Sequence, residues 1–357
     1  MNAKEKLNEF KEKLDVELDK FLTLKVEEAK KIDPEAEILM EHVKELTLRG
    51  GKRIRAALLY YSYIAHGGKN LKQAMRAAMG MEMSETFLLT HDDILDQDDL
   101  RRGGITIHAS YREICKKKFS KKSIDPAHFG RSMAIMAGDA AYALTNELIV
   151  TSDFKPKYQS RAIVELSQII VREVYGEILD VLIEVKDNPT RDDVFLVQQL
   201  KTAPYTFDSP IKLGAILAGA NEKRIKELEG YTVPLGTAYQ IQDDMLGMFG
   251  SEDKTGKPVI SDLREGKITL LILDALSHAS MDQKRVIQEA LGRKNVTVQD
   301  LKEVQKVIVE TGAFDKSKVT AKELAKEGHR SLSKIKLKNP GKEFLLGIAE
   351  YIINRDY

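Results

Sequence analysis

The sequence predicts an all-α protein, and three features of the 357-residue chain support this fold class. Apolar residues recur with the period of a helix, and Ala, Leu, Met, Glu and Lys fill long stretches such as residues 71–90. Only nine prolines occur, and none lies between Pro34 and Pro126. The turn signals of β-hairpins are scarce, so we expect helices rather than strands.

Turn-forming residues divide the chain into the predicted helices. The opening stretch MNAKEKLNEFKEKLDVELDKFL alternates charged residues with Leu, Phe and Val at helical spacing. Breaks are then predicted at Gly67-Gly68, Gly103-Gly104, 116–126, 187–189, 204–210, 250–258 and Asn339-Pro340. No segment resembles a flexible linker and no repeat of fixed period occurs, so we expect a single all-α domain over residues 1–357.

Composition excludes several classes of function. The 56 Lys and Arg residues balance 55 Asp and Glu residues, which leaves a net charge of +1 and no overall attraction to nucleic acid or to an anionic membrane. The single Cys115 excludes an internal disulfide and a multi-cysteine zinc site. The chain has no secretory signal pattern and no apolar run that predicts a membrane span, so we expect a cytoplasmic protein.

Five aspartates occur within eight positions of HDDILDQDDLRRGG, and two arginines follow them. If residues 84–98 form a helix, Asp92 and Asp96 share one face and Asp93 lies about 100° away. Like charges at this spacing, close to a helix C-terminus, destabilise an isolated helix. A bound cation would remove both penalties, so the stretch predicts a metal site. The alternative is a solvated acidic helix end that the two arginines neutralise.

Ligand type favours Mg²⁺ or Mn²⁺ at this site. Carboxylate oxygens suit both ions, and Mg²⁺ often bridges carboxylates to substrate phosphates. The spacing does not match a calcium-binding loop, and none of the seven histidines follows a Glu by three positions as a di-iron bundle requires. The neighbouring Lys and Arg residues then indicate a polyanionic ligand.

A second acidic pair, Asp243 and Asp244, lies in YQIQDDMLGMFG and predicts a second wall of the same site. The following GSEDKTGKP resembles a nucleotide-binding P-loop. It has one residue too many between its glycines, and Pro258 stands where Ser or Thr would bind magnesium. We therefore reject nucleotide binding and expect a loop that closes on a phosphate group.

Six ordered motifs resemble those of the trans-isoprenyl diphosphate synthases. They are GGKRIR (50–55), DDILDQDDLRRGG (92–104), GD (138–139), KT (201–202), QIQDD (240–244) and KTGKPVISDLREGK (254–267). The resemblance implies the isoprenoid synthase fold, a single domain of long helices around a deep cavity, usually as a homodimer. It also implies head-to-tail condensation of an allylic diphosphate (dimethylallyl, geranyl or farnesyl) with isopentenyl diphosphate and release of pyrophosphate.

The resemblance assigns roles to the residues of these motifs. Mg²⁺, at three ions per site and replaceable by Mn²⁺, would stabilise the charge on the departing diphosphate. Its ligands would be Asp92, Asp96 and Asp243, with Asp93 and Asp244 in support. The allylic diphosphate would contact Arg101, Lys201, Thr202, Gln240, Lys257 and Lys267. Isopentenyl diphosphate would contact Gly51, Lys52, Arg55 and Arg102 without metal. No side-chain base is evident, so the bound pyrophosphate would take the final proton.

Three residues depart from the family pattern. Gly247 stands where the second acidic motif commonly ends in a third Asp. Glu85 stands where members commonly have His or Gln near isopentenyl diphosphate, so an anion faces this pocket. Glu177 replaces a common Gln. Metal binding is retained if Asp243 is the principal ligand of the second wall.

Product length is predicted from the helix that precedes Asp92. Phe87 lies five residues upstream, about 7.5 Å along a helix, where a ring would form a floor for the growing chain. Leu88 beside it is not aromatic, and this pattern resembles archaeal synthases of geranylgeranyl diphosphate (C20). Farnesyl diphosphate (C15) is the alternative product, and an ordinary core residue is the alternative reading of Phe87.

Two other functions fit parts of the pattern. A class I terpene cyclase would share the fold and the first Asp motif, but it would not need GGKRIR or the paired arginines, and its usual second metal motif is absent. A noncatalytic partner subunit would keep the helices and lose metal ligands. Asp92, Asp96 and Asp243 are all present, so a catalytic synthase is favoured.

Overall fold

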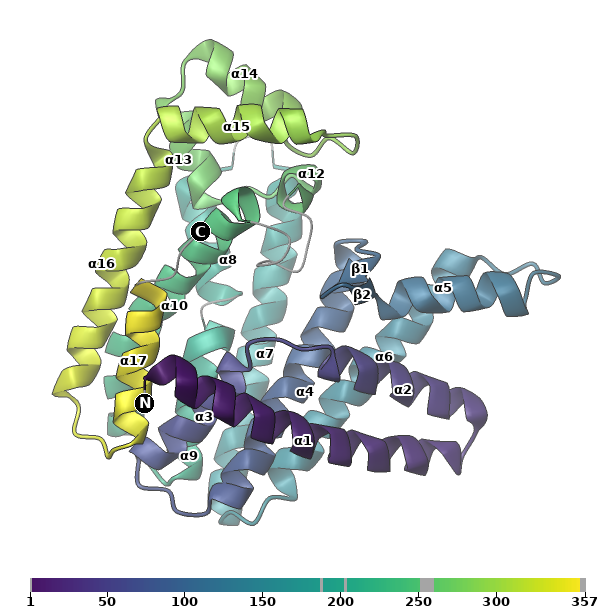
Figure 1. The fold of residues 1–357 in the computed structure, drawn as a ribbon, viewed down its shortest axis with the longest axis vertical. Helices are drawn as coiled ribbons and strands as arrows, with labels where there is room; N and C mark the ends of the chain where they lie inside the picture. The colour runs from purple at the N-terminus through teal and green to yellow at the C-terminus, as the bar shows by residue number, and fades with distance from the viewer. Residues whose placement is uncertain (1, 187–188, 202–203, 251–259, 354–357) are drawn as a thin grey trace.

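The computed structural model describes residues 2–186, 189–201, 204–250 and 260–353. Within these ranges it contains sixteen α-helices, one π-helical turn and one pair of two-residue strands, which confirms the predicted all-α class (Figure 1). The elements are α1 (Ala3–Lys30), α2 (Pro34–Leu48), α3 (Ile54–Ala65), α4 (Leu71–Leu95), β1 (Leu100–Arg101), β2 (Gly104–Ile105), α5 (Ile107–Lys118), α6 (Pro126–Val150), α7 (Pro156–Glu184), α8 (Arg191–Leu200), η1 (Pro204–Asp208), α9 (Ser209–Leu217), α10 (Glu222–Phe249), α12 (Ser261–Glu265), α13 (Leu270–His278), α14 (Met281–Ala290), α15 (Val298–Glu310), α16 (Ala313–Lys334) and α17 (Gly341–Ile353).

Local side-chain chemistry explains where several helices begin. The Asp33 carboxylate accepts a hydrogen bond from the backbone N–H of Glu35, and the intervening Pro34 opens α2. Asp125 does the same for Ala127 at the start of α6. Aspartate satisfies a backbone donor that has no partner within the helix, and proline fits the first turn because its missing N–H is not needed there.

The predicted break at residues 204–210 is wrong, because the whole of this segment is helical. Pro204–Asp208 forms a π-helical turn, and α9 continues directly from it at Ser209. Pro210 lies in the first turn of α9, where proline interrupts no hydrogen bond. The two prolines therefore start a helix instead of separating two.

Helix α4 ends at Leu95, three residues before the predicted end at Asp98. Gln97 has a φ of 57°, which a right-handed helix cannot accommodate. Asp96 caps the helix, and its backbone N–H still donates to the carbonyl oxygen of Asp92 at 2.8 Å. The two carboxylates thus remain one turn apart, as the sequence predicts.

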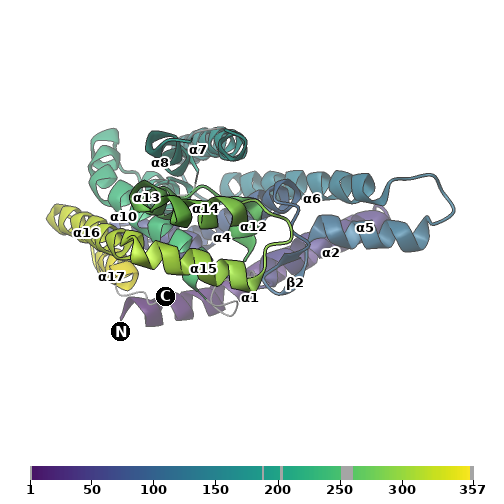
Figure 2. The same cartoon turned by 90° about the horizontal axis from the view of Figure 1, so that it is seen from above.

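The helices surround α4 and α10, which carry the two acidic motifs. Helix α4 packs against α6 and α3, and α10 packs against α16 and the η1 turn. Seen from above, α4 and α10 lie between the α7–α8 pair and α1 (Figure 2). Two helices in the interior of the molecule therefore carry the two acidic motifs, although the motifs are far apart in the sequence.

The last helix completes the core that the first one begins. Helices α1 and α17 are in contact, and residues from both belong to one cluster of buried apolar side chains. Two polar side chains of α10 also donate to backbone carbonyl oxygens of α17: the hydroxyl of Tyr231 to Leu345 and the amide of Gln242 to Ile352, each at 2.5 Å. Helix α10 is consequently fixed in place by the C-terminal helix.

Helix α7 exposes an apolar face. The exposed residues of this face are Val164, Val171, Val174, Tyr175, Ile178, Val181 and Leu182. None of the helices that the structure describes, α7 included, combines the length and apolar character needed to cross a bilayer. A contiguous apolar surface of this kind is typical of a contact with another protein surface.

Helices α3 and α9 approach closely at Gly214. A Cβ atom at this position would lie 2.2 Å from the carbonyl oxygen of Leu59 and 2.8 Å from Cβ of Ser62. The Ser62 hydroxyl donates to the carbonyl oxygen of Ile211 at 2.6 Å, which ties the same two helices together. Any larger residue at 214 would separate α9 from α3.

We predict that Gly214→Ala lowers the free energy of unfolding by about 1–3 kcal/mol, because the added methyl group has no space in this contact. Urea unfolding followed by circular dichroism measures the change. Gly230→Ala in α10 is the matched control, since its methyl group would chiefly meet the Ser331 hydroxyl at 2.5 Å, a side-chain end that can rotate away. Equal unfolding midpoints for the two variants would contradict the prediction.

Candidate active site

A cavity of about 1230 Å³ lies between α3, α4, α7, α8 and α10. Most of the predicted site residues line it: Gly51, Lys52, Arg55, Phe87, Leu88, Asp92, Arg101, Arg102, Lys201, Gln240, Asp243, Asp244 and Lys267. Asp93 and Asp96 are not among the lining residues. Thr202 and Lys257 lie outside the described residues. Segments from five of the six motifs thus meet around one space, as expected of a single site, whereas Gly138 and Asp139 of the GD motif are not among the lining residues.

At the C-terminal end of α4, Arg101 joins the first acidic motif. Its guanidinium donates to Asp93 at 2.5 Å and to Asp92 at 2.9 Å, and it lies 3.6 Å from Asp98. Burial disfavours the charge of Arg101, but Asp92 and Asp93 outweigh this effect and raise its pKa. Arg101 therefore neutralises part of the acidic cluster in this structure, in addition to facing the cavity.

Lys201, which follows α8, joins the first acidic wall to α7. Its Nζ lies 2.5 Å from Glu177, 2.8 Å from Asp180 and 3.9 Å from Asp92. Burial opposes its charge, but these carboxylates prevail and raise its pKa above the ordinary value. Lys201 is therefore charged throughout the physiological pH range.

Three acidic residues of α7 face this cavity, and the sequence analysis gave none of them a role in the site. Glu173, Glu177 and Asp180 line the cavity and follow one another at intervals of four and three residues, which places them on one helix face. Burial raises the pKa of Glu177 to about 7 and that of Glu173 well above its ordinary value. Their i, i+4, i+7 spacing is visible in the sequence and would have indicated an acidic face on this helix.

The second acidic wall is the pair Asp243 and Asp244 on α10. Burial raises the pKa of Asp244 to about 7, and the nearby Asp262 and Asp243 act in the same direction. The Gln240 side chain opposes the shift by donating to Asp244 at 2.6 Å. Gln240 thus contacts an acidic residue one turn away, besides lining the cavity as predicted.

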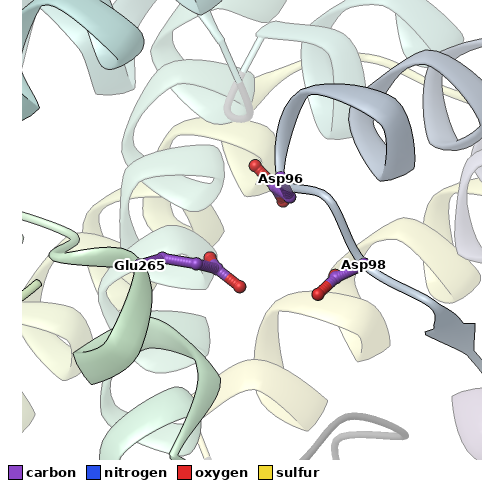
Figure 3. A group of neighbouring side chains, drawn as sticks. All are labelled: Asp96, Asp98 and Glu265. Carbon is purple, nitrogen blue, oxygen red and sulfur yellow. The ribbon is translucent and has the colours of Figure 1, made fainter. Parts of the chain in front are cut away.

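Asp96, at the C-terminal end of α4, faces Glu265 of α12 (Figure 3). Asp96, Asp98 and Glu265 each offer an oxygen within 4.8 Å of the others' (Figure 3). Lys267 lies beside this group, with Nζ 2.8 Å from Glu265 and 3.8 Å from Asp96. Neither Asp98 nor Glu265 was predicted as a site residue, although both belong to the ordered motifs at 92–104 and 254–267.

These carboxylates form a donor set that suits magnesium. Asp92 on α4 and Asp243 on α10 both line the cavity, and Asp96 lies beside Asp98 and Glu265. All are oxygen donors, which Mg²⁺ and Mn²⁺ prefer, and nearby lysines offer contacts for a phosphate that the metal would bridge. The residues therefore fit the predicted cation.

A second group of cations lies near the start of α3. Arg55 donates to Glu85 at 3.1 Å and to the Thr206 hydroxyl at 2.8 Å. Arg102 donates to the carbonyl oxygen of Gly50 at 2.6 Å and lies 3.6 Å from Glu85. Glu85 consequently contacts both arginines, so the unusual anion of this pocket is paired with them.

Phe87 and Leu88 line the cavity on α4, one turn before Asp92. The Phe87 ring centroid lies 4.9 Å from that of His91 and 5.1 Å from that of Tyr142 on α6. Val174 and Ile178 of α7 line the same cavity. This combination of rings and aliphatic side chains provides an apolar region beyond the acidic motif.

Comparison with known proteins agrees with this geometry. The family model described as polyprenyl synthetase matches residues 36–308. The geranylgeranyl diphosphate synthase of Saccharolobus solfataricus is 35% identical over 72% of this chain and 73% of its own, and the geranylfarnesyl diphosphate synthase of Aeropyrum pernix is 31% identical over 86% and 91%.

A solved structure resembles the whole chain. The geranylgeranyl pyrophosphate synthase of Corynebacterium glutamicum, complexed with isoprenyl diphosphate and magnesium, has a TM-score of 0.91 and 29% identity over 98% of this chain and 99% of that one. This similarity confirms the expected isoprenoid synthase fold. Because the family model spans most of its length, the chain belongs to the polyprenyl synthetase family of prenyltransferases.

Proposed function

We propose that this chain condenses an allylic diphosphate with isopentenyl diphosphate, head to tail, to make geranylgeranyl diphosphate. One observation carries the proposal: a single cavity joins a carboxylate group suited to magnesium with a separate pair of arginines. Two diphosphates would therefore find two different anion sites next to one apolar region. The relatives named above as geranylgeranyl and geranylfarnesyl diphosphate synthases support the reaction class.

The allylic diphosphate would bind at the acidic walls. Asp92, Asp96 and Asp243 would hold Mg²⁺, at three ions per site, with Mn²⁺ as a substitute. The metal would stabilise the negative charge that develops on the diphosphate as its C–O bond breaks. Lys201 and Lys267 would contact the diphosphate oxygens from either side, and Arg101 would hold Asp92 and Asp93 in place; Thr202 and Lys257 belong to the same predicted pocket.

Isopentenyl diphosphate would bind at Lys52, Arg55 and Arg102, over the backbone of Gly51. Fixed cations suit this substrate because its own diphosphate is not a leaving group, so no additional charge develops on it. Glu85 holds Arg55 and Arg102 together before the substrate arrives. The carbon–carbon double bond of isopentenyl diphosphate would then attack the allylic carbon. The released pyrophosphate would take the proton that the condensed product loses.

The position of Phe87 in the cavity lining supports a C20 product. A growing prenyl chain would pass from Asp92 along α4 and meet the Phe87 ring, which Tyr142 supports from behind. Farnesyl diphosphate would result if the growing chain met the floor one five-carbon isoprene unit earlier. The relatives include synthases named for geranylgeranyl and for the longer geranylfarnesyl diphosphate, and in this proposal the floor residue decides between such products.

A homodimer is also part of the proposal. The exposed apolar face of α7 would be buried against a second copy of the chain, because soluble monomers rarely expose so many neighbouring aliphatic residues. Val174, Ile178 and Val181 of this helix also line the cavity, so the partner would close one side of the site.

One assay tests the proposed reaction. Purified protein is incubated with Mg²⁺, isopentenyl diphosphate and, in turn, dimethylallyl, geranyl or farnesyl diphosphate, and the dephosphorylated products are analysed. Linear C20 alcohols are expected. Cyclic hydrocarbons would instead identify a terpene cyclase, and an absence of turnover with every primer would identify a noncatalytic subunit.

We predict that Asp92→Ala and Asp243→Ala each lower turnover about a thousandfold, because each removes a carboxylate that holds the metal against the leaving group. Steady-state kinetics at saturating Mg²⁺ measures the loss. Asp282→Ala, which removes an exposed carboxylate from α14, is the control and should retain wild-type turnover. Turnover near the wild-type value in either folded site variant would contradict the mechanism.

The two anion sites should separate by kinetics. Arg102→Ala is expected to raise KM for isopentenyl diphosphate about ten- to a hundredfold, because it removes a charged donor to that substrate, with little change in KM for the allylic substrate. Lys201→Ala should do the reverse. Equal changes of both KM values in both variants would show that the two diphosphates are not bound as proposed.

Phe87→Ala is expected to lengthen the main product beyond C20, because it removes the ring that would stop the chain. Chromatography of the dephosphorylated alcohols measures the length. Phe129→Ala, which removes a ring of α6 that does not line the cavity, should lower stability without changing the product. An active Phe87→Ala enzyme that still stops at the wild-type length would exclude Phe87 as the floor.

A further inference from the structure

Gly247 leaves room for a carboxylate from another helix. It lies one helical turn after Asp243, where the second acidic motif of the family commonly ends in a third Asp. A Cβ atom at 247 would lie 1.9 Å from Oδ2 of Asp262 and 3.0 Å from its Cγ. The Asp262 carboxyl group therefore occupies the volume that any side chain at 247 would require.

The backbone around Asp262 is well anchored. Asp262 belongs to the short helix α12, and its carbonyl oxygen accepts hydrogen bonds from the N–H groups of Gly266 and Lys267. The next residue, Leu263, is fully buried, and its carbonyl oxygen accepts the N–H of Gly292 at 2.9 Å. The position of Asp262 beside Gly247 therefore follows from packing rather than from an exposed side chain that happens to point inward.

Asp262 lies between the two acidic walls. It lines the cavity with Asp243 and Asp244, and its Oδ1 is 4.0 Å from Nζ of Lys267, which in turn lies 3.8 Å from Asp96. Crowding like charges in this way is unfavourable unless a cation is bound there.

We propose that Asp262 supplies the third carboxylate of the second acidic wall, in place of the side chain that Gly247 lacks, and acts there on bound magnesium. The inference rests on the proposed function, since the metal site belongs to that reaction. It assigns Gly247 a specific role as well: the glycine is the space in which the Asp262 carboxylate lies. The two positions form one unit, and a change at either should affect the other.

An exchange of the two side chains tests this inference. The probe is Mn²⁺ binding in the presence of inorganic pyrophosphate, followed by electron paramagnetic resonance of the free ion, so no turnover is needed. Asp262→Ala is expected to weaken Mn²⁺ binding roughly ten- to a hundredfold. Gly247→Asp should also weaken it, because the new side chain collides with Asp262. The double variant Gly247→Asp/Asp262→Ala should recover most of the affinity, since it moves the carboxylate from α12 to α10.

Two further variants make the result specific. Gly247→Asn/Asp262→Ala has nearly the same shape as the exchanged pair but lacks the charge, and it should bind Mn²⁺ as weakly as Asp262→Ala. Asp262→Asn replaces Asp262→Ala if the latter unfolds, as judged by circular dichroism. Wild-type Mn²⁺ affinity in Asp262→Ala or Asp262→Asn, or no recovery of affinity in the exchanged pair, would overturn this inference. Either result would leave the proposed function standing. An absence of pyrophosphate-dependent Mn²⁺ binding by the wild-type protein would overturn the proposed function with it.

Discussion

Asp92 is held between Arg101 and Lys201, and the rest of the site depends on this arrangement. The three residues come from α4, β1 and the end of α8, so the two contacts fix segments that are distant in the sequence. Burying such charges is unfavourable unless they are paired and further hydrogen-bonded, as Asp93, Glu177 and Asp180 provide here. The result is a set of charges that is oriented before any ligand binds, which is the condition for strong electrostatic stabilisation.

In each of the two proposed anion sites, the cations are paired with carboxylates of the protein itself. Arg55 and Arg102 contact Glu85, and Lys201 contacts two carboxylates of α7, so a diphosphate would have to replace these partners. A diphosphate that replaces a carboxylate partner gains less binding free energy than one that binds a cation without a partner. It also explains how a family position that usually carries His or Gln can carry Glu85: the additional negative charge is matched by two arginines.

Signals that are local in the sequence predicted most of the fold and the main features of the site. Helical periodicity, glycine pairs and cap residues located the helices, and the dense aspartates pointed to Asp92 and Asp243. Two details of the prediction were wrong for local reasons: the 204–210 segment is helical because both prolines stand in first turns, and α4 ends at Leu95 because Gln97 has a positive φ. Glu173, Glu177 and Asp180 were missed because their spacing places them on one helix face but does not show that this face lines the cavity, and Asp262 was missed because nothing near it in the sequence indicates that it lies beside Gly247.

The hydrogen bonds from Tyr231 and Gln242 to α17 have a consequence for biosynthesis. Gln242 directly precedes Asp243, and its partner, the carbonyl oxygen of Ile352, is translated more than a hundred residues later. On the ribosome, these two donors of α10 cannot reach their acceptors until α17 has been made, so the nascent chain exposes an incomplete core in the interval. Exposed apolar helices at that stage are the surfaces that chaperones bind, and the helix that carries Asp243 is not held by α17 until the two have docked.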